Sequence, residues 1–169
     1  MWELFGTLEE IKPKITSDLL NEAVVYWESL CAGRGMPSRA SIDPMAIPRL
    51  LPTIYIVIAG ENGEFRYQLA GSLIEESYRL GSLKDKTPEE VAGDAAENVL
   101  GPYRRVRDEA VIFYREATLE WVSAAQKYTH YKALLLPLSD DGARVNMLLG
   151  VQDFVRARPG RRSGAVPIQ

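Results

Sequence analysis

The dipeptide Asn62-Gly63 narrows the possible folds of this chain most, because it lies between two β-rich runs, residues 53–60 and 64–70. Asn-Gly is the preferred pair for a two-residue hairpin turn. Such a turn pairs Ile58 with Tyr67 and Ile56 with Leu69. The residues expected on one face, looking into the core, are Ile56, Ile58, Phe65, Tyr67 and Leu69. Those expected on the other face are Arg66, Gln68, Tyr55 and Val57.

A second hairpin is predicted near the other end of the chain. Residues 128–138 and 144–153 are apolar runs joined by a Ser-Asp-Asp-Gly turn, and residues 111–121 alternate as a half-buried strand does. Turns of two or four residues give the same parity in this hairpin. The residues predicted to share its core face are Leu134, Leu136, Leu138, Val145, Met147, Leu149 and Val151.

Helices are predicted before and between these strands. Residues 17–33 carry an apolar stripe at helical spacing, with a Ser/Asp start and a Gly stop. Asp43 can cap a short helix that opens at Pro44. Thr87-Pro88-Glu89-Glu90 forms a capping box, from which helix is expected to run to about Ala110 with a break near Gly101-Pro102. The order of elements predicts an α+β domain with one antiparallel sheet and helices on its face.

Composition points to one domain in a reducing compartment. The 169 residues are 46% apolar, and Cys31 is the only cysteine, so a cytoplasmic location is expected. No run is long enough to span a membrane, and no secretion signal is seen at the start. The formal charge of the whole chain is −3, and four arginines lie in residues 154–169. The rest of the chain is therefore more strongly negative, which argues against nucleic acid as the main ligand. We expect one domain over residues 1–153 and a flexible tail over 154–169.

Three segments of the chain carry a distinctive combination of residues. The first combines Trp27-Glu28-Ser29-Leu30 and Gly33-Arg34-Gly35-Met36-Pro37-Ser38-Arg39 with Ile42-Asp43-Pro44 and Ile47-Pro48-Arg49-Leu50-Leu51-Pro52. The second is Phe65-Arg66-Tyr67-Gln68-Leu69-Ala70-Gly71. The third runs from Leu134-Leu135-Leu136-Pro137-Leu138-Ser139-Asp140-Asp141-Gly142 to Met147-Leu148-Leu149-Gly150. Together these segments resemble stand-alone bacterial PAS proteins, which have little besides this domain.

The resemblance implies a PAS-like five-stranded antiparallel sheet in the order 2-1-5-4-3, with helices closing a pocket on one face. It places the PAS core at residues 53–153, after an extra N-terminal helix at 17–32. PAS domains sense small molecules, redox state or light and signal through protein contacts. This resemblance implies a sensory or ligand-binding module that acts as a signalling adaptor toward a protein partner, with no settled ligand.

Hairpin parity and the aromatic residues together select the candidate pocket lining. Aromatic rings are more often plain core, but a buried tyrosine needs a partner for its hydroxyl, which can give a pocket a polar anchor. The candidates are Ile56, Tyr67, Leu69, Tyr103, Phe113, Leu136 and Met147.

Catalytic and metal chemistry are poorly supplied. His130 is the only histidine, and Cys31 lies on the apolar stripe of the first helix, so no metal site and no bound haem are expected. No cysteine suits flavin photochemistry. Turn and capping preferences account for Asp140, Asp141 and Asp43. We therefore predict that the protein is not an enzyme. The alternatives are a small cone-shaped α+β enzyme of the isomerase or dehydratase type and a purely structural interaction domain.

Arg39 has two interpretations. Beside a capped helix start, its guanidinium can hold an anion or a neighbouring carboxylate. Its plainer role, which we favour, is to pin the proline-rich connector to the sheet.

The first helix suggests self-association. Its apolar stripe must be covered from outside the pocket-side helices, either by the outer sheet face in the same chain or by a second copy. That outer face is expected to carry Tyr55, Val57, Leu135 and Leu148. An apolar surface wider than half the helix predicts a homodimer. The residues expected in its interface are Leu19, Val24, Val25, Tyr26 and Trp27.

Overall fold

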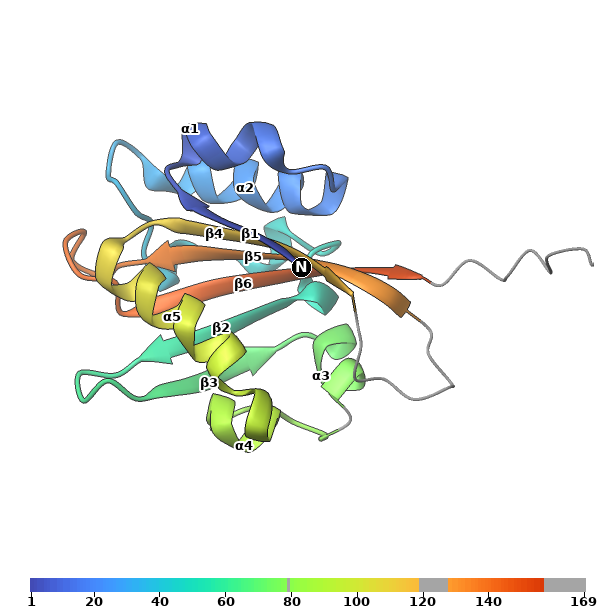
Figure 1. The fold of residues 1–169 in the computed structure, drawn as a ribbon. Coiled ribbons are helices and arrows are strands. Elements are labelled where there is room, and N and C mark those ends of the chain that lie inside the picture. Colours follow the sequence, from blue (N-terminus) through green and yellow to red (C-terminus); the bar gives the residue numbers. More distant parts are fainter. Residues whose placement is uncertain (79, 119–127, 157–169) are drawn as a thin grey trace, which may run out of the picture.

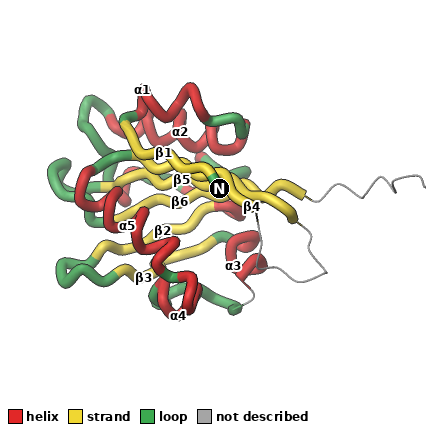
Figure 2. The backbone as a smooth tube through the Cα atoms, viewed as in Figure 1, coloured by secondary structure: helices red, strands yellow, loops and turns green. Residues whose placement is uncertain are grey.

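A computed structural model describes residues 1–78, 80–118 and 128–156 as an α+β domain with one antiparallel sheet (Figures 1 and 2). Its strands are β1 (Trp2–Gly6), β2 (Ile54–Ala59), β3 (Phe65–Ala70), β4 (Ile112–Thr118), β5 (Tyr128–Leu138) and β6 (Met147–Arg156). Its helices are α1 (Leu8–Ile11), α2 (Asp18–Cys31), α3 (Ser72–Tyr78), α4 (Pro88–Ala92) and α5 (Glu97–Glu109). Within these residues no helix is long and apolar enough to cross a membrane.

The sheet has six strands in the order β1-β4-β5-β6-β2-β3. Strands β2 to β6 follow the predicted order 2-1-5-4-3, so the α+β class and the arrangement of these five strands are confirmed. Strand β1 was not predicted, because Trp-Glu-Leu-Phe-Gly is too short to establish an alternation. It pairs antiparallel with β4 and adds an edge to the sheet. The last residues of the predicted strand 111–121, from residue 119, lie outside the described part of the chain.

The predicted register of the first hairpin is only partly right. Residues 60–64 separate the two strands, so the turn is longer than the two residues expected, and Gly63 has φ +81°. Val57 therefore pairs with Tyr67, and Ile58 pairs with Arg66. A β-bulge at Gln68 restores the predicted pair of Ile56 and Leu69. Between the longer turn and the bulge, Phe65 and Tyr67 therefore share a face with Val57 instead of with Ile56 and Ile58.

Helices cover both faces of the sheet, with α2 on one side and α5 on the other (Figure 1). By strand pairing, the face toward α2 carries Leu134, Leu136, Leu138, Met147, Leu149 and Val151 of the second hairpin together with Ile54 and Ile56, while Val145 lies in the loop before β6. The face toward α5 carries Tyr55, Val57, Leu135 and Leu148, which were predicted to lie on an outer face under the first helix. That assignment is wrong. Both sets are apolar, so hydrophobicity alone does not distinguish the faces.

Helix α2 is covered within one chain. Ser17 caps it by accepting from the backbone N–H of Leu20, and Trp27 Nε1 donates to the carbonyl oxygen of Pro137 on β5 at 3.0 Å. Val24 and Trp27 are buried and Leu19 is half-buried. Tyr26 is half-buried and its hydroxyl accepts from the backbone N–H of Asp43. Of the five residues predicted in a dimer interface, only Val25 stays largely exposed, at 56%.

Helix α5 lies across the sheet and contacts its two edge strands. Arg105 stacks on Phe5 of β1, with Cζ 4.1 Å from the ring centroid, and Arg107 stacks on Phe65 of β3 at 5.1 Å. The predicted break at Gly101-Pro102 is not seen, because the helix continues through both residues. The break lies instead at Gly93, where φ is +54°.

Candidate ligand-binding core

Three tyrosines from different elements meet between α5 and the sheet. Tyr55 lies on β2, Tyr67 on β3 and Tyr103 on α5, and all three are buried. The hydroxyls of Tyr67 and Tyr103 are 3.2 Å apart and share a hydrogen bond. The ring of Tyr55 lies 5.9 Å from that of Tyr67 and 6.5 Å from that of Tyr103, centroid to centroid. The face thus has an aromatic wall with polar tips.

Burial keeps these phenols uncharged. It raises the pKa of Tyr55, Tyr67 and Tyr103, because the phenolate form would lose its hydration. Near neutral pH each hydroxyl can therefore both donate and accept a hydrogen bond. None is prepared to act as a general base, which would need a pKa near the working pH.

The buried cation Arg115 completes the polar part of this face. Its side chain is 9% exposed, and its Nε donates to Glu3 Oε1 at 2.9 Å. Its Nη2 donates to the same oxygen and, at 2.9 Å, to the backbone carbonyl of Asn98 on α5. Residue 102 would normally donate to this carbonyl, but it is a proline and has no N–H. Arg115 thus binds a carbonyl that Pro102 leaves open.

More polar side chains adjoin Arg115. Gln152 and Tyr131 are buried on the same face, and Tyr78 on α3 is half-buried. Burial raises the pKa of Tyr78, and its hydrogen bond with Gln152 opposes that shift only in part. Burial disfavours the charged form of Arg115, but Tyr131 and Glu3 outweigh this and raise the pKa of its guanidinium. Phenols, an amide and a paired cation therefore gather beside the aromatic wall.

The structure divides the predicted pocket residues between two faces. Tyr67, Tyr103 and Phe113 lie on the α5 side, where the tyrosine cluster forms. The remaining four, on the α2 side by strand pairing, are Ile56, Leu69, Leu136 and Met147. The residues divide because the register of β3 changes at the bulge at Gln68, and because α5 covers the face that was predicted to lie under the first helix.

Sequence reasoning missed Tyr55, Arg115 and Gln152 as members of this site. A signal for Tyr55 was present in Gly150, its partner on β6. A Cβ at Gly150 would lie 2.0 Å from Cζ of Tyr55, so the tyrosine ring needs a residue without a side chain there. Arg115 carried no such signal, because its partners Glu3 and Asn98 are distant in the sequence.

Arg39 contacts the edge strand β3. Its Nε donates to Oε1 of Gln68 at 3.0 Å, and Gln68 is the bulged residue of β3. Arg39 therefore joins the segment between α2 and β2 to the irregular point of the edge strand.

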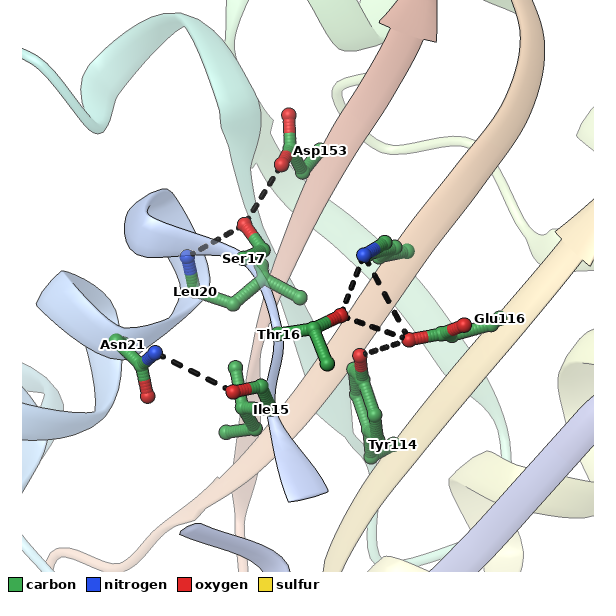
Figure 3. Close-up of polar contacts among 9 residues, drawn as sticks. Ile15, Thr16, Ser17, Leu20, Asn21, Tyr114, Glu116 and Asp153 are labelled. Carbon is green, nitrogen blue, oxygen red and sulfur yellow. Dashed lines mark hydrogen bonds and ion pairs between the residues drawn. The ribbon is translucent and has the colours of Figure 1, made fainter. Parts of the chain in front are cut away.

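A polar junction links the start of α2 to the α2 side of the sheet (Figure 3). Ser17 donates from Oγ to Oδ2 of Asp153 at 2.6 Å while it caps the helix. Glu116 Oε1 accepts from Thr16 at 3.1 Å and from Tyr114 at 2.6 Å. These bonds lower the pKa of Glu116, the bond from Tyr114 contributing most. The junction fixes the N-terminus of α2 against β4 and β6.

The remaining chemical candidates lie apart from this core. His130 is exposed on β5, and Cys31 is half-buried with its Sγ 3.4 Å from the carbonyl oxygen of Trp27. Burial raises the pKa of the Cys31 thiol, and the negative charge of Glu28 raises it further, so the reactive thiolate is disfavoured. In the described parts of the chain no three His, Cys, Asp or Glu side chains gather as metal ligands do.

The fold and this site define the class of protein. A central antiparallel sheet with the order β4-β5-β6-β2-β3, covered by α3 to α5 on one face, is the arrangement that the sequence resemblance implied. Residues 15–152 match the family model for the PAS domain, and the chain belongs to that family. No curated protein and no solved structure matches the chain. Strand β1 lies outside the matched residues.

Proposed function

We propose that this protein is a sensory module that binds a small uncharged molecule on the α5 side of its sheet. Membership of the PAS family supports a sensory or signalling role in general. The observation that carries the proposal is the tyrosine cluster between the sheet and α5, which combines ring faces with neutral hydroxyls. Such surfaces suit a ligand with aromatic and hydrogen-bonding groups.

The charges around the cluster favour an uncharged ligand. Arg115 is already neutralised by Glu3, so an anionic ligand would have to displace a carboxylate held through two nitrogens. The raised tyrosine pKa values also argue against an enzyme, because no group in the cluster is poised to move a proton near neutral pH.

The signal is proposed to leave through α5. Tyr103 on this helix contacts Tyr67, while Arg105 and Arg107 contact the two edges of the sheet. A ligand that shifts Tyr103 would therefore move residues that hold β1 and β3. The output is protein contact, as an adaptor requires, and the single cysteine fits a cytoplasmic site of action.

A second candidate is a structural interaction domain with a filled core. The close packing of the rings of Tyr55, Phe65, Tyr67 and Tyr103 on one another favours this candidate. The two candidates differ in whether a molecule can enter beside the rings.

Native mass spectrometry of the freshly purified protein, together with its absorption spectrum, tests the proposal. We expect a copurified small molecule whose retention is reduced by Tyr103→Phe and unaffected by Tyr26→Phe on α2. Equal retention in both variants would place binding elsewhere. If the wild type carries no added mass and a library of uncharged aromatic compounds leaves its Tm unchanged, the filled-core candidate replaces the sensor.

A further inference from the structure

The two edges of the sheet are protected unequally. At the β3 edge, residues 83–87 run beside the strand, so that Tyr67 N donates to the carbonyl of Lys86 and Asp85 N donates to the carbonyl of Tyr67. At the other edge, β1 pairs with β4 alone, and among the described residues no backbone hydrogen bond joins its outer side. Open edges are templates for another strand.

Strand β1 lacks three of the features that usually block such pairing, namely proline, lysine and a β-bulge. It contains no proline and no lysine, and its pairing with β4 is regular over its five residues. Trp2 is 45% exposed and Met1 is 81% exposed at its start. An exposed tryptophan on an unprotected edge is typical of a surface that another protein covers.

Two charged groups on the α5 face of this edge have unused bonding capacity. Glu3 binds Arg115 through Oε1 only, and in the described structure its Oε2, on a side chain 31% exposed, makes no hydrogen bond. Arg105, which stacks on Phe5, binds Glu109 through Nε only, so within the same residues both of its Nη groups are open. A free carboxylate oxygen thus lies at Glu3, and a free guanidinium edge lies over Phe5, two residues further along β1.

We propose that β1 is the interface for a second copy of this chain, paired antiparallel with its own β1 about a two-fold axis at Leu4. Antiparallel pairing of one strand with itself is self-complementary, since each copy supplies the same donors and acceptors. This register places Leu4 opposite Leu4 of the second copy and Glu3 opposite Phe5 of the second copy. Each Glu3 then faces the Arg105 that stacks on that Phe5, and two ion pairs form.

The match of charges selects a second copy over an unrelated peptide. Glu3 and Arg105 are both on this chain, and the two-fold axis brings Glu3 of each copy opposite Arg105 of the other. A pairing of five residues a side buries a small area, so the dimer is weak and depends on protein concentration. It joins two sheets into one and leaves the α2 surface free. The dimer does not depend on ligand binding, and so goes beyond the proposed function.

Sedimentation equilibrium of the full chain over a wide range of concentrations tests the interface. We expect a reversible dimer that Arg105→Glu weakens at least tenfold, because Glu3 then faces a like charge. Arg104→Glu is the matched control: it makes the same change of charge one residue away, on a side chain paired with Glu97, and should leave dissociation nearly unchanged. Circular dichroism verifies that both variants are folded.

Three outcomes would overturn the proposal: a wild type that is monomeric at every concentration, equal weakening by both arginine variants, or a dimer broken by Val25→Glu but not by Arg105→Glu. The last would return the interface to α2. Hydrogen exchange gives a second reading, in which amides of residues 2–6 become more protected as protein concentration rises. Retention of the small molecule in native mass spectrometry is measured separately, so the failure of one idea leaves the other standing.

Discussion

The guanidinium of Arg115 on β4 donates to the backbone carbonyl of Asn98 in the first turns of α5. This bond explains how α5 accommodates Pro102 without a break. A proline inside a helix leaves the carbonyl four residues earlier without its donor, and a buried unpaired carbonyl is costly. Arg115 supplies the missing donor from the sheet, so a tertiary contact completes the hydrogen bonding of this helix.

Replacing Arg115 tests this bond. We expect Arg115→Met to lower the free energy of unfolding by about 2–4 kcal/mol, because Glu3 and Asn98 both lose a charged donor. In a Pro102→Ala background the loss should be smaller, since residue 102 then donates to Asn98 itself. Urea unfolding of the four proteins measures the coupling. Equal losses in both backgrounds would show that Asn98 does not depend on Arg115. Glu97→Gln, at an exposed ion pair, is expected to change stability by less than about 0.5 kcal/mol.

Gly150 is predicted to be intolerant of any side chain. A Cβ there would lie 2.0 Å from Cζ of Tyr55, so Gly150→Ala must displace a buried ring. We expect a loss of about 1–3 kcal/mol in thermal or urea unfolding, although alanine is otherwise the better strand residue. Gly101→Ala is the control, because nothing lies within 4 Å of its Cβ position in α5, and it should stabilise the protein slightly. A Gly150→Ala protein as stable as the wild type would contradict the packing of Tyr55.

The buried tyrosines predict a loss of stability in alkaline solution. Their pKa values are raised in the folded state, so the unfolded chain releases these protons first as pH rises. The stability that these tyrosines contribute is fully present below the unfolded tyrosine pKa of about 10. It is lost as pH rises above that value toward the pKa values of the folded state. Unfolding free energies measured from pH 8 upward, with tyrosinate absorbance as the direct readout, test this. We expect a shallower fall in Tyr67→Phe than in Tyr26→Phe, and equal slopes would mean that the cluster does not cause it.

Ser17 is expected to contribute to stability both as a helix cap and as a link to the sheet. Ser17→Ala removes the acceptor for Leu20 N and the donor to Asp153, so the free energy of unfolding should fall by about 1–2 kcal/mol. Ser29→Ala, at the exposed end of the same helix, removes only a bond to the carbonyl of Tyr26 and should have little effect. Denaturant unfolding of both variants measures the difference. If both variants lost the same free energy of unfolding, the bonds of Ser17 to Leu20 and Asp153 would not stabilise the protein.

Local sequence determined most of the elements and their order. Thr87 and Glu90 form the predicted capping box, Ser17 caps α2, and Asp43 caps the turn that opens at Pro44. Each of these signals acts over a few residues, and so a sequence can carry it without its partners. The alternation in β5 and β6 likewise placed Leu134, Leu136 and Leu149 on one face.

The tertiary structure alone decided which face receives which helix and where the polar core forms. Leu136 and Leu135 are equally apolar, and a sheet covered on both faces satisfies either assignment until α2 and α5 are docked. The longer turn puts Tyr67 on the opposite face from the one predicted, and the bulge at Gln68, where Arg39 binds, restores the predicted pairing at Leu69. Arg115 meets Glu3 across a sequence separation of 112 residues. Local patterns record what a residue buries, but the partner that a buried polar group requires depends on the whole chain, because only folding brings the two together.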